Sequence, residues 1–149
     1  MNDELIATDH ALAQACADQM WAADRASPAL GMRLEDVGPG RARLAMPVGP
    51  EMLNGAGTCH GGLIFALADS AFAFACNTNG MVSVAQHCTI TFLQPVRAGE
   101  TLVADAHERQ REGRSGIYDV RVTSGDAVVA EFRGHSRTTG ERFDVGHAA

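Results

Sequence analysis

The sequence predicts an α+β fold in which a curved antiparallel sheet of about six strands wraps around one long buried helix. Three observations predict it. One run, from about Gly61 to Asn77, is apolar on nearly every side, as expected of a helix that is covered all round. Six other runs resemble half-buried strands, with apolar and polar residues in alternation. The breaks between the last four runs are short turn signals, which favour antiparallel hairpins.

An amphipathic helix is expected first, over about residues 9–26. Thr8 or Asp9 can cap its start, and Ser27-Pro28 ends it. Because only one of its faces is apolar, this helix should lie on the outside of the fold. That face carries Leu12, Cys16, Met20 and Ala23.

The strands are expected in two groups, two before the buried helix and four after it. No linker, repeat or low-complexity stretch interrupts the chain, so residues 1–149 are expected to form a single domain. Its core should span about 30–138, and the tail from about 140 should be frayed. The six expected strands are about Met32 to Val37, Arg41 to Val48, Val82 to Leu93, Thr101 to Arg109, Gly116 to Thr123 and Ala127 to Thr138.

Composition and charge narrow the possible partners. A net charge of −6 argues against a nucleic-acid surface, which needs a basic stripe. The N-terminus lacks the features of a signal peptide, and the longest apolar stretch, Leu63 to Ala68, is too short to span a bilayer. The four cysteines show no CxxC spacing, so we expect reduced thiols, a cytoplasmic location and no membrane partner.

The segment that carries most information is NGAGTCHGGLIFALADS, from Asn54 to Ser70. The carboxylate of Asp69 falls inside the apolar helix, and a buried, unpaired charge needs either a partner or a chemical role. Gly61 and Gly62 stand where the helix begins, so their backbone N–H groups and the positive end of the helix dipole are available to an anion. The segment therefore combines an anion site with a candidate base.

Helix geometry separates these two groups. Gly61 and Asp69 are eight residues apart, or roughly 12 Å along a helix. Reacting groups must converge to within about 3–3.5 Å, so Asp69 should not serve the anion site of its own helix. If two such helices run antiparallel across a two-fold axis, Gly61 of one subunit can face Asp69 of the other. We therefore expect an obligate homodimer with two composite sites.

The same segment resembles a known family. The pattern is Asn54-Gly55, then His60-Gly61-Gly62, Phe65, and Leu67-Ala68-Asp69-Ser70, and it resembles the hotdog-fold thioesterase superfamily. More closely it is similar to the PaaI-type acyl-CoA thioesterases of phenylacetic acid degradation, over about residues 30–138. The resemblance implies hydrolysis of acyl-CoA, with phenylacetyl or hydroxyphenylacetyl groups as typical acyl groups, and a dimer of dimers.

The resemblance also implies residue roles. The N–H of Gly61 would bind the thioester carbonyl oxygen, and Asp69 would act as general base or nucleophile. Asn54 would orient the thioester or the attacking water, although Asn-Gly is also an ordinary turn dipeptide. His60 would have a positioning role. Arg114 and Gly116, near a late turn, would contact CoA, or would simply be solvated turn residues; no cofactor other than the CoA of the substrate is expected.

The same residues allow other interpretations. Two Cys-His pairs, Cys59-His60 and His87-Cys88, offer zinc-type ligands, but adjacent strand residues point to opposite faces, so no metal is expected. A hotdog hydratase or dehydratase would pair a histidine such as His60 with an acid such as Asp69. A non-catalytic acyl-CoA-binding module is the third alternative. The Ser70 hydroxyl is expected to bond back to a helix carbonyl one turn earlier.

Overall fold

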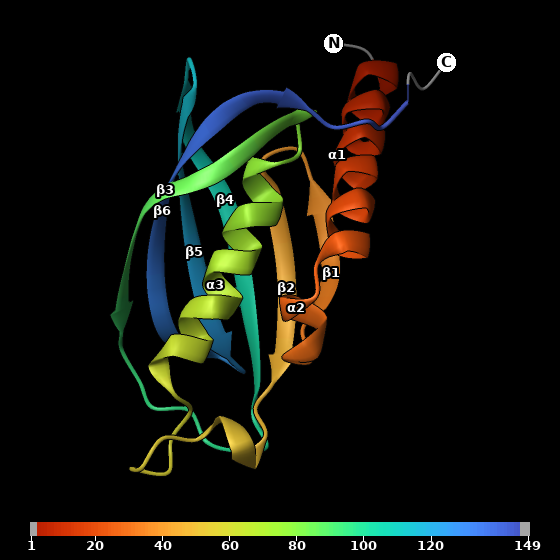
Figure 1. The fold of residues 1–149 in the computed structure, drawn as a ribbon. Coiled ribbons are helices and arrows are strands. Elements are labelled where there is room, and N and C mark those ends of the chain that lie inside the picture. The colour runs from red at the N-terminus through yellow and green to blue at the C-terminus, as the bar shows by residue number, and fades with distance from the viewer. Residues whose placement is uncertain (1–2, 147–149) are drawn as a thin grey trace.

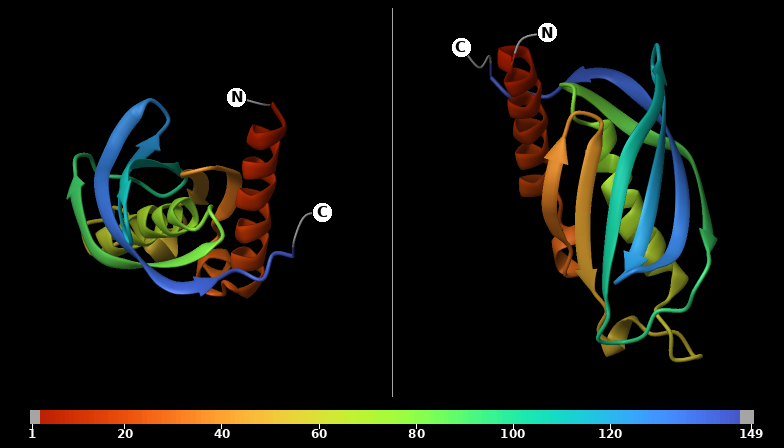
Figure 2. Two further views of the ribbon diagram at one scale, coloured as in Figure 1. Left: turned by 90° about the horizontal axis from the view of Figure 1, so that it is seen from above. Right: turned by 180° about the vertical axis from the view of Figure 1, so that it is seen from behind.

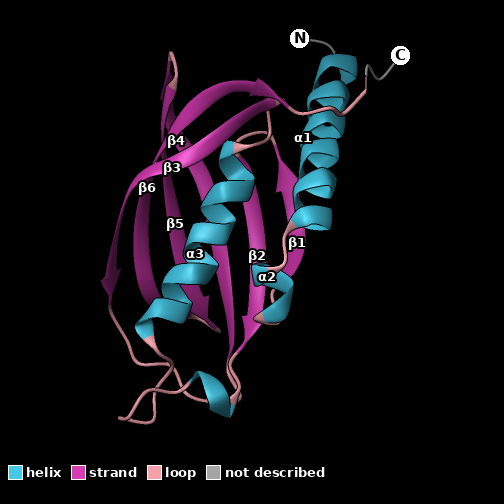
Figure 3. Cartoon of the chain, viewed as in Figure 1, coloured by secondary structure: helices cyan, strands magenta, loops and turns pink. Residues whose placement is uncertain are grey.

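The computed structural model describes residues 3–146, and it has the predicted architecture (Figures 1 and 3). All six strands form one antiparallel sheet in the order β1-β2-β4-β5-β6-β3. The helical elements are α1 (Asp3–Ala23), α2 (Ala26–Ala29), the 3-10 turn η1 (Pro50–Met52) and α3 (Gly61–Cys76). The strands are β1 (Arg33–Gly38), β2 (Arg41–Pro47), β3 (Met81–Phe92), β4 (Thr101–Glu112), β5 (Ser115–Ser124) and β6 (Ala127–Arg142).

The sheet curves around α3, which fills the concave side (Figure 2). The inward face of α3 is fully covered by strand residues, so its apolar run supplies most of the hydrophobic core. At Gly134 of β6 the strand lies so close that an added Cβ would come within 2.8 Å of the Phe72 ring. The most completely buried residues of α3 are Leu67, Ala68, Ala71, Phe72 and Ala75.

The helix α1 lies outside the sheet, beside the edge strand β1, as predicted from its single apolar face (Figure 2). Its bounds differ from the prediction. Within the described residues it already includes Asp3 and Glu4, whose acidic side chains suit the first turn of a helix, and Thr8 bonds back to the Glu4 carbonyl instead of capping. It ends at Ala23, and a separate turn, α2, follows because the Asp24 carboxylate accepts the N–H of Ser27.

The last strand also differs from its predicted end. Residues 140–142, predicted as part of a frayed tail, belong to β6. Met81 pairs with Arg142, and the N–H of Phe143 donates to the carbonyl of Gly80 at 2.9 Å. The long partner strand β3 thus holds this part of the chain in the sheet.

The two edges of the sheet are β1 and β3. The β3 edge is 12 residues long, and much of it is exposed. Three large apolar side chains there or just beyond are half exposed: Val84 at 52%, Phe92 at 50% and Leu93 at 53%. A long edge with exposed apolar residues is unusual in a chain that stays single, because its free N–H and C=O groups can pair with another strand.

Candidate functional site

The start of α3 presents one free backbone donor. His60 is the N-cap residue, and its Nδ1 accepts the N–H of Gly62 at 2.9 Å. Its own N–H donates to the carbonyl of Met52 at 2.8 Å, which fixes the turn that leads into the helix. The N–H of Gly61, the first helical residue, has no acceptor among residues 3–146. The positive end of the helix dipole and a free N–H therefore coincide at Gly61.

Asn54 organises the loop that precedes this helix. Its Oδ1 accepts the N–H groups of Ala56 at 3.0 Å and Thr58 at 3.2 Å, and its Nδ2 donates to the Thr58 hydroxyl at 3.2 Å. The turn role that the Asn-Gly dipeptide suggested is thus present in the structure. An amide nitrogen carries two hydrogens, so one N–H of Asn54 remains for a ligand.

Asn54 and Gly61 line one hollow of about 370 Å³. It lies between the loop, the first turn of α3 and the segment that follows β3. A Cβ added at Gly61 would meet Cζ of Phe92 at 3.0 Å, so the Phe92 ring lies close against Gly61. The walls are mostly apolar and suit an acyl group. The remaining lining residues are Thr58, Cys59, Ile64, Leu93, Gln94, Pro95 and Val96.

Asp69 lies elsewhere, in the middle of α3, and does not line this hollow. It is half buried, and desolvation raises the pKa of its carboxyl above the ordinary value. No ion pair to Asp69 is present among the described residues. Its recorded side-chain partner is the thiol of Cys88, with Sγ 4.0 Å from Oδ1. As the helix geometry predicts, Asp69 and Gly61 lie at different places along α3.

The two residues expected to contact CoA lie on either side of the start of β5, Arg114 in the preceding turn and Gly116 in the strand. The Arg114 guanidinium donates to the carbonyl of Thr138, from Nε at 3.2 Å and from Nη2 at 2.8 Å. Gly116 is buried, and an added Cβ would come within 2.7 Å of the Ser136 hydroxyl. Close packing therefore explains the glycine. It also lines a hollow of about 170 Å³ with Gln86 and His135, and Arg114 does not line it.

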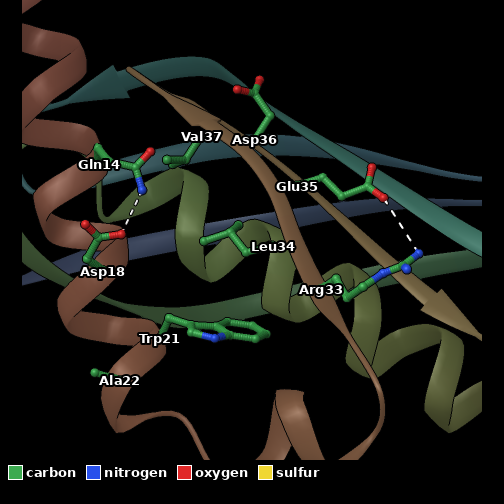
Figure 4. Close-up of a pocket in the computed structure, with 9 residues that line it drawn as sticks. All are labelled: Gln14, Asp18, Trp21, Ala22, Arg33, Leu34, Glu35, Asp36 and Val37. Atoms are coloured by element: carbon green, nitrogen blue, oxygen red, sulfur yellow. Dashed lines mark hydrogen bonds and ion pairs between the residues drawn. The ribbon is translucent and has the colours of Figure 1, made fainter.

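Another hollow, of about 470 Å³, lies between α1 and β1 and contains none of the predicted site residues (Figure 4). The Trp21 ring and Leu34 form its apolar part. Its polar rim is paired internally: Gln14 donates to Asp18 at 2.7 Å, and Arg33 lies 4.0 Å from Glu35. Sequence patterns gave no signal for this groove, because it depends on how α1 meets the sheet edge.

Residues proposed for other roles are also located. Among residues 3–146, no three His, Cys, Asp or Glu side chains gather in a way that could hold a metal ion. Cys59 lines the hollow at Gly61, whereas Cys88 lies beside Asp69. The Ser70 hydroxyl bonds to the hydroxyl of Ser27 at 2.9 Å, not to a helix carbonyl as expected, because α2 brings a buried partner next to it.

Within the part of the chain that the structure describes, no helix is long and apolar enough to cross a membrane. Two contacts near the site were not predicted: Cys88 against Asp69, and Phe92 against Gly61. The alternation of β3, which sets Cys88, Ile90 and Phe92 on one face, was the signal that could have found them.

Comparison with known proteins agrees with this geometry. The family model described as "Thioesterase superfamily" matches residues 56–131. Acyl-coenzyme A thioesterase PaaI of Escherichia coli is 43% identical over 125 residues, which cover 83% of this chain and 89% of that protein. A putative esterase of Archaeoglobus fulgidus is 35% identical over 127 residues, covering 85% of this chain and 82% of the relative.

A solved structure agrees as well. The structure of the E. coli PaaI protein, from the phenylacetic acid degradation operon, matches this chain with a TM-score of 0.88 and 41% sequence identity. The match covers 89% of this chain and 97% of the E. coli chain. The six-stranded sheet around a central helix is therefore the predicted hotdog fold. The chain belongs to the thioesterase superfamily, and it is a thioester hydrolase of the PaaI type.

Proposed function

We propose that the chain hydrolyses aromatic acyl-CoA, of the phenylacetyl or hydroxyphenylacetyl type, to the free acid and CoA. The observation that carries the proposal is the free N–H of Gly61 at the start of α3, on a residue that lines a hollow beside Phe92. An aromatic acyl group is supported by that ring and by the E. coli relative, whose structure is of a protein from the phenylacetic acid degradation operon.

In the proposed reaction the thioester carbonyl oxygen accepts the N–H of Gly61. Negative charge grows on this oxygen in the transition state, and the helix dipole stabilises it. The remaining Nδ2 hydrogen of Asn54 orients the thioester or the water. His60 acts by positioning, since its Nδ1 holds the N–H of Gly62 and leaves that of Gly61 free.

Asp69 supplies the second half of the chemistry. As a general base it takes a proton from water, whose oxygen attacks the carbonyl carbon; the C–S bond breaks, and the CoA sulfur leaves with a proton. As a nucleophile it attacks the carbonyl carbon itself, the C–S bond breaks and CoA leaves as the thiolate, which takes up a proton; water then hydrolyses the mixed anhydride to the free acid and restores Asp69. Burial favours both routes, because it makes the carboxylate more basic.

We propose that Asp69 acts on substrate bound at Gly61 of a second copy. Antiparallel pairing of two β3 edges across a two-fold axis would set the neighbouring α3 helices antiparallel. It would also cover the exposed side chains of Val84, Phe92 and Leu93. Each homodimer would hold two composite sites, and two dimers would form a tetramer.

The rest of the proposal concerns CoA and the cellular setting. Arg114 and Gly116 would lie near the nucleotide part of CoA, with the exposed guanidinium as the charged contact. No cofactor is needed, because CoA belongs to the substrate. All four cysteines are free thiols, which agrees with a cytoplasmic protein.

A thiol-release assay tests the function. Phenylacetyl-CoA is compared with short and long aliphatic acyl-CoAs, for the wild type and for Asp69→Asn. We expect the aromatic substrate to have the highest kcat/KM and the variant to lose turnover. Hydration of an enoyl-CoA without thiol release would support the hydratase alternative, and tight acyl-CoA binding without turnover would support the binding module.

A further inference from the structure

The carboxylate of Asp69 has an unusual neighbour. Cys88 Sγ lies 4.0 Å from Oδ1, and no other hydrogen bond reaches the carboxylate within residues 3–146. Buried carboxylates in proteins are ordinarily held by backbone N–H, hydroxyl or cationic groups. Here the holding group is a thiol, the weakest of the side-chain donors.

The fold fixes where this thiol stands. Cys88 lies on β3 opposite Gly134 of β6, and its half-buried side chain packs with that of Ile90 against the core around α3. The register of β3 shifts between Ala85 and His87, immediately before Cys88. A bulge redirects the side chains that follow it, so the strand is shaped at the point where the thiol meets the helix.

The charge states suit donation from sulfur to oxygen. Burial, and then the charge of Asp69, raise the pKa of the Cys88 thiol, so it keeps its proton at neutral pH. The other titratable group beside this pair is Cys76, whose pKa burial raises to about 12. Both thiols are therefore neutral, and the carboxylate is the one charge in the cluster.

We propose that Cys88 is a positioning residue for Asp69: its S–H donates to Oδ1 and turns Oδ2 toward the reacting carbonyl or water. A thiol fixes the orientation of the carboxylate and draws little charge from it, whereas a hydroxyl or backbone N–H would make it less basic. This inference rests on the proposed role of Asp69.

The test compares Cys88→Ala, Cys88→Ser and the control Cys16→Ala, which removes a buried thiol on α1 far from the site. We expect Cys88→Ala to lower kcat about tenfold, equivalent to about 1.4 kcal/mol, with KM unchanged. The acidic limb of the pH profile of kcat should move to higher pH in this variant, because the charged carboxylate of Asp69 loses a hydrogen-bond donor. Cys88→Ser should restore most of kcat and return the limb to the wild-type position or below it.

Each outcome has a distinct meaning. Wild-type kcat and an unmoved acidic limb in Cys88→Ala would overturn the inference. Equal losses in the Ala and Ser variants, with no shift of the limb, would also overturn it, because they indicate a packing role. Full activity of Asp69→Asn would instead refute the proposed role of Asp69, so the two failures are distinguishable.

Discussion

The free N–H of Gly61 can be removed without removing the helix that carries it. Proline lacks the N–H but is well tolerated at the first helical position, where that N–H has no partner in the helix. The preceding residue must then be extended, and His60 already is, at φ −58 and ψ 128. Gly61→Pro therefore deletes the proposed oxyanion donor and leaves the hydrogen bonds of α3 intact.

The magnitude follows from a matched variant. Both Gly61→Pro and Gly61→Ala add a Cβ that meets Cζ of Phe92 at 3.0 Å, a ring that can move because it is half exposed. The difference in kcat between the two variants therefore reports on the loss of the N–H and on the methylene that replaces it in proline. Loss of one oxyanion donor lowers kcat by roughly a hundredfold to a thousandfold, or about 2.7–4 kcal/mol.

Thiol release from phenylacetyl-CoA gives kcat for both variants, and thermal unfolding shows whether both are folded. We expect Gly61→Ala to retain most of the wild-type kcat and Gly61→Pro to lose at least about 99% of it. If two equally stable variants had kcat values within threefold of each other, the N–H of Gly61 would not be the oxyanion donor.

Four further predictions concern the same site; the first is measured by thermal unfolding and the other three by thiol release. Asp69→Asn should unfold at a higher temperature than the wild type at neutral pH and at the same temperature in acid. The pKa of Asp69 is higher in the folded than in the unfolded protein, so the wild type loses stability as pH rises through the folded-state pKa, whereas the asparagine of the variant carries no charge at any pH. For the same reason, the acidic limb of the pH profile of wild-type kcat should give a pKa above that of an ordinary carboxyl group. A limb at the ordinary carboxyl pKa would contradict the role of Asp69 as base or nucleophile. Phe92→Leu should reduce the preference for aromatic over aliphatic acyl-CoA by about twofold to tenfold, the worth of an aromatic contact, with the dimer intact by gel filtration. Purified heterodimers of Asp69→Asn with Gly61→Pro should regain about half of the wild-type activity per dimer, because one composite site is complete, and no recovery would exclude shared sites.

The parts of the fold that sequence predicted are those fixed by local patterns. The all-round apolar run could only be a covered helix, and α3 begins at Gly61 as predicted. The site residues at this helix start could be predicted for the same reason, because a cap, a glycine turn and a helix terminus are adjacent in the chain. The free N–H of Gly61 is a consequence of that order.

What sequence missed depends on contacts between distant segments. The end of β6, residues 139–142, is polar and exposed, so it shows no alternation; its pairing with β3 makes it a strand. The hydroxyl contact of Ser27 with Ser70 joins residues 43 apart in the chain. The contact of Cys88 with Asp69 spans 19 residues and needs the strand to fold back along its own helix.

The position of Asp69 has a consequence for how activity depends on association. A carboxylate in the middle of an apolar helix destabilises the single chain, and the free donor of Gly61 lies too far along that helix to use it. In the proposed dimer each group meets its counterpart only across the two-fold axis. Activity should then fall with dilution as dimers dissociate, more steeply than the folded fraction, and it should be recovered when the protein is concentrated.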